Sequence, residues 1–75
     1  MGAEAPYTTH EVQVLLVSRG FAAQENSQVT WHRDRDRILV SLDPNRRSCV
    51  WFDRTANQKA TLSFNALANK LTSEQ

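Results

Sequence analysis

The sequence lacks most of the features that mark specialised classes of protein. It has one cysteine, two glycines and two prolines in 75 residues. A single cysteine excludes an internal disulfide framework, and the low glycine and proline content excludes collagen-like chains and most disordered ones. No apolar run approaches the ~18 residues that span a bilayer. We therefore expect one small globular domain without a membrane partner.

The sequence also has no large excess of basic over acidic residues, or of acidic over basic ones. Nine basic and eight acidic side chains give a formal net charge of +1, which is too balanced to identify a polyanionic partner. Residues 1–6 have neither a basic start nor a long apolar stretch, so we predict a flexible tail there and no signal peptide. The lone Cys49 lies within an apolar run and suits a reducing compartment. We expect a cytoplasmic protein.

Signals for the start and the stop of a helix bracket residues 9–18. Thr8 and Glu11 have the spacing of a capping box, in which each side chain satisfies a free backbone N–H group. Gly20 followed by Phe21 is the pattern of a Schellman motif, which ends a helix. These signals predict a helix over about residues 9–18.

Segments typical of strands follow, separated by turn signals. The predicted strands are residues 29–32, 38–42 and 48–52, with a short fourth strand at 59–61. Ser63 is a suitable N-cap for a second helix, because apolar residues then recur at i, i+3, i+4 and i+7 from Phe64.

This order predicts a two-layer α+β domain over residues 7–72, with α-β-β-β-α order. Its sheet is an antiparallel meander of three strands, or four if residues 59–61 pair, and both helices pack on one face. Residues 73–75 form a polar C-terminal end.

Arginine is concentrated in the two turns between the predicted strands. Seven of the nine basic residues are arginine, and five of them lie in or beside these turns: Arg33, Arg35, Arg37, Arg46 and Arg47. The planar guanidinium group binds phosphate through two hydrogen bonds. The leading hypothesis is a binding module that contacts nucleic acid through these arginines. The alternative is that Asp34 and Asp36 neutralise the arginines of their turn.

The third predicted strand carries more apolar residues than one sheet face can bury. Trp51 and Phe52 are neighbours, so they point to opposite faces. One of them must lie on the face away from the helices, where an aromatic ring can stack on a base. We include Trp51 in the nucleic-acid-binding set. The alternative is that this face is covered by a loop, the tail or long side chains.

A competing hypothesis is a protein-binding regulator, such as a small inhibitor, an adaptor or a phage-type accessory protein. Val14 and Val17 fall on the side of the first helix opposite its core stripe. Together with Phe21 they form a candidate surface for a protein partner or a second copy of the chain.

The sequence offers little for catalysis. A third hypothesis is a metal-independent ribonuclease that uses His32 beside Asp34 and Asp36. Cys49 is a poor nucleophile because its apolar neighbours raise its pKa. No metal-ligand spacing and no phosphate-binding glycine loop is present. We therefore expect no enzyme activity, metal, cofactor or small-molecule substrate.

Overall fold

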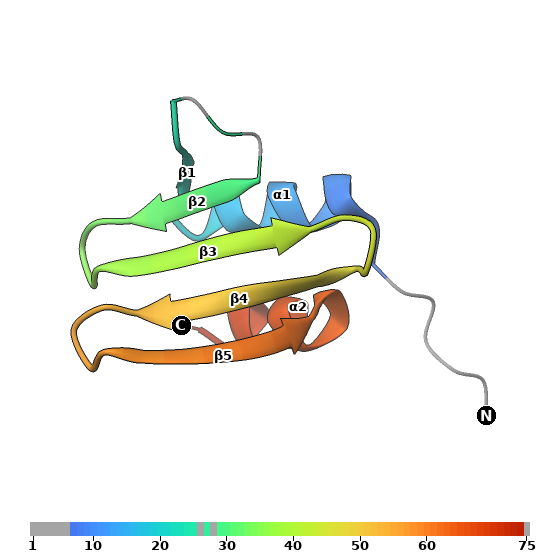
Figure 1. Ribbon diagram of the computed structural model, residues 1–75. Helices are drawn as coiled ribbons and strands as arrows, with labels where there is room; N and C mark the ends of the chain where they lie inside the picture. The colour runs from blue at the N-terminus through green and yellow to red at the C-terminus, as the bar shows by residue number, and fades with distance from the viewer. Residues whose placement is uncertain (1–6, 26, 28, 75) are drawn as a thin grey trace.

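The protein folds as an antiparallel sheet with two helices behind it (Figure 1). The computed structural model describes residues 7–25, 27 and 29–74, so the predicted tail at 1–6 lies outside the described residues. The elements are α1 (Thr9–Ser18), β1 (Ala22–Ala23), β2 (Thr30–Arg33), β3 (Ile38–Asp43), β4 (Ser48–Asp53), β5 (Gln58–Ser63) and α2 (Phe64–Thr72). In this part of the chain, no helix has the length and apolar character needed to cross a membrane.

Helix α1 begins and ends where its capping signals predict. The Thr8 hydroxyl accepts a hydrogen bond from the Glu11 N–H at 3.1 Å, and the Glu11 carboxylate accepts one from the Thr8 N–H at 2.9 Å. At the other end Gly20 has φ 90°, and the Phe21 N–H donates to the Leu16 carbonyl at 2.9 Å. This is the Schellman geometry, and it turns the chain back toward the sheet.

The α+β class and the antiparallel meander are confirmed, but the strand count was wrong. The sheet has five strands in the order β1-β2-β3-β4-β5. Ala22 and Ala23, which lie outside every predicted strand, pair with His32 and Trp31. Strand β5 covers six residues rather than the predicted 59–61. Neither segment has the apolar alternation that identifies a strand, because β1 and β5 lie at the edges of the sheet.

The three hairpins between β2 and β5 share one loop design. Each loop has four residues, at 34–37, 44–47 and 54–57. The last residue of each loop has a positive φ, 59° at Arg37, 50° at Arg47 and 54° at Asn57. The first and third loops lie at one end of the sheet, where the Arg54 N–H donates to the Arg37 carbonyl at 3.1 Å. The second loop lies at the opposite end (Figure 1).

The core lies between the sheet and the helices. Helix α1 contributes Val12 and Leu16, and α2 contributes Phe64, Leu67 and Leu71. The helices also contact each other. The sheet contributes alternate residues of its central strands, namely Trp31, Ile38, Val40, Leu42, Cys49 and Trp51. Since successive strand residues alternate between faces, the residues between these form a second face with neither helix on it.

Candidate nucleic-acid interface on the open sheet face

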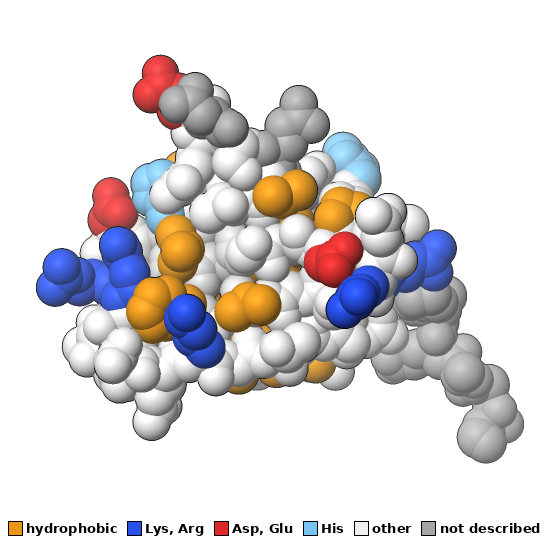
Figure 2. All heavy atoms as spheres, viewed as in Figure 1, with side chains coloured by type: hydrophobic (Ala, Val, Ile, Leu, Met, Phe, Trp, Pro, Cys, Tyr) orange, Lys and Arg blue, Asp and Glu red, His pale blue; other side chains and the backbone are white. Residues whose placement is uncertain are grey.

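We call this second face the open face, and its most distinctive feature is a row of four side chains across the strands. His32, Leu39, Phe52 and Lys59 are successive cross-strand neighbours from β2 to β5. The next row consists of Thr30, Ser41, Val50 and Thr61. Figure 2 shows apolar side chains in the middle of this face, with lysine and arginine side chains toward both ends.

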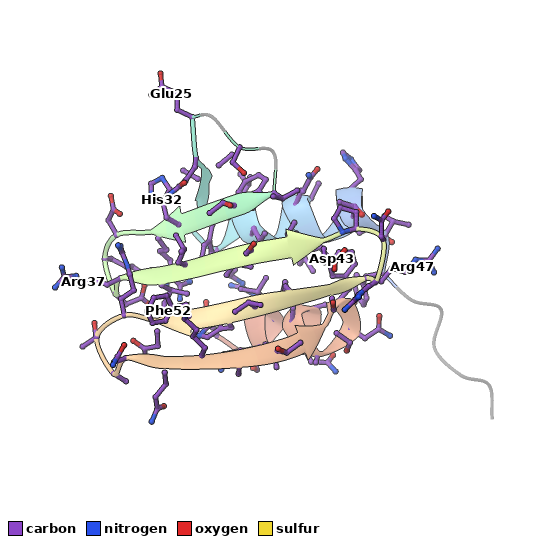
Figure 3. The ribbon with its side chains drawn as sticks, in the orientation of Figure 1. Glu25, His32, Arg37, Asp43, Arg47 and Phe52 are labelled. Atoms are coloured by element: carbon purple, nitrogen blue, oxygen red, sulfur yellow. The ribbon has the colours of Figure 1, made fainter. Side chains whose placement is uncertain are left out.

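Phe52 is the aromatic residue that strand pairing places on the open face. Its ring is partly exposed, and the Lys59 ammonium lies 5.0 Å from the ring centroid. Figure 3 places Phe52, His32 and Arg37 toward one end of the sheet, and Asp43 and Arg47 toward the other. The open face therefore combines an aromatic surface with cations at its margins.

Trp51, which we included in the nucleic-acid-binding set, lies on the opposite face. Its side chain is only 8% exposed, and it packs edge-on against Phe21 with ring centroids 5.9 Å apart. The Lys70 ammonium covers the indole at 4.9 Å from the ring centroid. Trp51 is therefore a core residue, and any stacking role on the open face passes to Phe52.

Arg33, also in that set, is a buried structural residue. It is 3% exposed and binds two carboxylates: Asp36 at 2.8 and 3.0 Å and Glu74 at 2.8 and 2.9 Å. It also donates to the Arg19 carbonyl at 3.0 Å and lies 4.5 Å from the Phe21 ring centroid. Hydrogen bonding to Glu74 is the main reason that the pKa of Arg33 is raised. This guanidinium has no capacity left for a ligand.

Among the described residues, this network leaves the other two arginines of the turn without an ion pair, although the charge of Arg35 adds to the hydrogen bonding by Arg33 in lowering the pKa of Glu74. Asp36 binds Arg33, and Asp34 lies 3.2 Å from Nδ1 of His32. In the described residues, Arg35 and Arg37 consequently have no carboxylate within 4 Å. The alternative, in which Asp34 and Asp36 neutralise the arginines of their turn, therefore holds for Arg33, which Asp36 binds. It does not extend to Arg35 and Arg37 among the described residues.

The turn at the other end of the sheet is also exposed. Nε of Arg46 lies 3.9 Å from Asp43, a long contact between exposed groups that contributes little. Arg47 is exposed, and no carboxylate lies within 4 Å of it among the residues that the structure describes. Both guanidinium groups can therefore reach a phosphate.

Of the three residues predicted for the partner-binding surface, two are exposed on α1 and one is buried. Phe21 is 3% exposed and contributes to the core, so it is removed from the partner-binding set. Val14 and Val17 are 53% and 59% exposed. With His10 they line a shallow hollow of about 430 Å³.

Within the described part of the chain, the candidate catalytic residues His32 and Cys49 lie apart from each other on the sheet. The His32–Asp34 contact can hold the imidazole in place, but it does not supply both an acid and a base, so the ribonuclease hypothesis stays a prediction for a cleavage assay. Cys49 is buried, and burial raises the pKa of its thiol to about 11. Within the described ranges, no three histidine, cysteine or acidic side chains are grouped so that they could hold a metal ion.

Comparisons with known proteins assign neither a family nor an activity, since no family model, curated protein or solved structure matches this chain.

Proposed function

We propose that this protein is a small non-catalytic module that binds single-stranded nucleic acid across its open face. The observation that carries the proposal is the position of Phe52 in a cross-strand row with Leu39 and His32. Unpaired bases stack on aromatic side chains presented by a flat sheet. Each stacked base is worth about 1–3 kcal/mol by alanine substitution. Lys59 ends this row, and Arg37 lies toward the same end of the sheet as Phe52 and His32 (Figure 3), where both can meet the phosphates of a strand stacked there.

Lys59 covers part of the surface that a base would use. An exposed cation–π contact is worth about 0.5–1 kcal/mol, less than the ~1–3 kcal/mol gained from stacking a base on an aromatic ring. An incoming base therefore displaces the ammonium group from the ring. The displaced group is then available for the adjacent phosphate, so the lysine contact is exchanged rather than lost.

The open face favours a single strand over a duplex. Its six-residue strands span roughly 20 Å, room for a few extended nucleotides, and stacking on Phe52 requires a base that is not already paired. The small net charge of +1 implies few phosphate contacts. With about three of them, the logarithm of the binding constant should fall with the logarithm of salt concentration at a slope near −2.

Fluorescence anisotropy with labelled oligouridylate and oligothymidylate, and with a duplex of matched length, tests the proposal at low salt. Phe52→Leu keeps an apolar side chain but removes the aromatic ring, and we expect about 5- to 50-fold weaker binding. Arg37→Gln should weaken binding and reduce the salt slope by about 0.7. The matched control is Val17→Ser on α1, which should bind like the parent protein.

Two results would overturn this function. One is the absence of binding to any single strand at low salt. The other is binding that Phe52→Leu leaves unchanged, since affinity would then come from charge alone.

The exposed valines of α1 support a second candidate, a protein-binding regulator. Val14 and Val17 are large apolar side chains that are exposed and do not pack into the core. If they form a self-association surface, sedimentation equilibrium should show a dimer that Val14→Ser dissociates. A protein that stays monomeric at high concentration, with or without the substitution, counts against self-association through this helix.

A further inference from the structure

We propose that the outer edge of β5 binds an extended acidic peptide, which adds to the sheet as a further strand. Strand β5 pairs with β4 on one side, and among the described residues no strand pairs with its other side. Figure 1 shows β5 at the margin of the sheet, beyond β4. This inference does not depend on nucleic-acid binding, because it concerns the edge of the sheet rather than its open face.

The edge of β5 is long and regular. Its pairing with β4 runs without interruption from Ser48↔Ser63 to Asp53↔Gln58, so no bulge twists it away. Five of its six residues are exposed and the sixth is half-buried. Because hydrogen bonding alternates along an antiparallel ladder, about half of these residues direct their N–H and C=O groups outward. The opposite edge, β1, has only two residues.

Proteins usually protect such an edge with charged side chains, proline, bulges or a covering segment. Strand β5 has the sequence Gln-Lys-Ala-Thr-Leu-Ser, with one charge and no proline. Adding a strand to an exposed edge is a common mode of peptide recognition, in which main-chain hydrogen bonds supply affinity and flanking side chains supply specificity. The chemistry beside β5 therefore indicates which peptide fits.

Two lysines lie beside this edge, one on each face of the sheet. Lys59 rests on the ring of Phe52, toward the open face. Lys70 of α2 rests on the ring of Trp51, toward the helices. Together with Gln58 they line a hollow of about 400 Å³. Neither lysine has a carboxylate within 4 Å in the part of the chain that the structure describes.

One carboxylate does line the hollow, but it is engaged in its own turn. Oδ1 of Asp53 accepts hydrogen bonds from the N–H groups of Thr55 and Ala56, at 3.0 and 3.2 Å. Asp53 keeps its negative charge, but the two lysines outnumber it, so the charged side chains that line the hollow are positive on balance.

This arrangement selects a strand with acidic residues at adjacent positions. Successive side chains of a strand point to opposite faces, so one carboxylate reaches Lys59 and the next reaches Lys70. A basic peptide would instead place like charges beside both lysines.

The test is an NMR titration of the whole labelled chain with the capped peptide Thr-Val-Glu-Glu-Val-Thr. We expect shifts centred on β5 and slower amide exchange along its outer edge. The same peptide with N-methyl groups on alternate residues keeps its charge but cannot form a ladder, and should bind at least tenfold more weakly. Lys70→Glu should weaken binding about fivefold or more, whereas the matched Lys70→Arg should bind like the parent.

Equal binding of the N-methylated peptide would overturn the proposal, because the contact would then be charge pairing alone. Absence of binding, shifts centred away from β5, or equal binding of the analogue with lysines in place of the glutamates would also overturn it. Arg37→Gln separates the two proposals, because Arg37 does not line the hollow beside β5. It should weaken nucleic-acid binding but leave peptide affinity within about twofold, so either proposal can fail while the other stands.

Discussion

The side chain of Glu74 should matter far more to stability than its place beside the C-terminus suggests. It supplies two of the hydrogen bonds that hold the buried Arg33 guanidinium, at 2.8 and 2.9 Å. The perturbation is Glu74→Ala, which leaves Arg33 with Asp36 and the Arg19 carbonyl as its partners.

The size of the effect follows from burial. Removing one partner of a fully buried ion pair costs about 3–5 kcal/mol. Asp36 remains, and the Glu74 side chain is 25% exposed, so we expect a smaller loss of about 2 kcal/mol. A domain of this length has a total free energy of unfolding of roughly 4–11 kcal/mol. The melting temperature should fall by about 10–15 °C.

The pH dependence distinguishes an ion pair from simple packing. Hydrogen bonding to Arg33 lowers the pKa of Glu74 below its ordinary value of 4.5. A lowered pKa in the folded state means that the stabilisation is present above about pH 4.5 and is lost as the pH falls through the lower, folded-state value. The difference between the parent and Glu74→Ala should therefore be largest near neutral pH and shrink in acid.

Urea denaturation at pH 7 and at pH 3 is the assay. Glu25→Ala is the matched control, because Glu25 is exposed and forms no ion pair within the described residues. The reasoning is refuted if Glu74→Ala is as stable as Glu25→Ala at pH 7. It is also refuted if its deficit is unchanged at pH 3.

Three further predictions concern single residues. Arg37→Asn should raise the free energy of unfolding by about 0.5 kcal/mol, because asparagine tolerates the left-handed conformation better than arginine. The same change should weaken nucleic-acid binding, so urea denaturation and anisotropy should move in opposite directions. Gly20→Ala should lower the free energy of unfolding by about 1–2 kcal/mol in urea denaturation, because φ is +90° there. The added carbon meets only the Arg33 side chain, at an ordinary contact distance of 3.6 Å, so a much larger loss would contradict this reasoning. Cys49, with its pKa raised to about 11, should react slowly with a thiol reagent at pH 8 and rapidly in denaturant, and fast labelling of the folded protein would contradict its burial.

Local sequence signals predicted the parts of the fold that depend on near neighbours. The capping box at Thr8 and the Schellman glycine at Gly20 fixed the bounds of α1, and Ser63 marked the start of α2. The same reasoning missed β1 and shortened β5. Both are edge strands with mostly exposed side chains, so they carry no alternating apolar pattern. Their pairing is set by the backbone of the neighbouring strand.

The candidate site was harder to predict because it depends on contacts that are distant in sequence. Trp51 and Phe52 are neighbours in a strand, so the sequence predicts that they point to opposite faces of the sheet. Only the position of the helices decides which of the two is buried. Arg33 looked like its neighbours Arg35 and Arg37. Its partner Glu74 is 41 residues away, in the predicted polar end at residues 73–75. The alternating arginines and aspartates of residues 33–37 do not indicate which arginine is buried.

The contact between α1 and α2 joins elements from opposite ends of the described chain. Neighbouring hairpins can assemble strand by strand, but the layer that shields them from water is complete only when both helices have docked. Detachment of either helix would expose a large part of the core, including Leu16 or Phe64. A partly unfolded state is therefore hardly lower in free energy than the fully unfolded state. Proteases should find few partly unfolded molecules to cleave, even though no disulfide holds this small protein together.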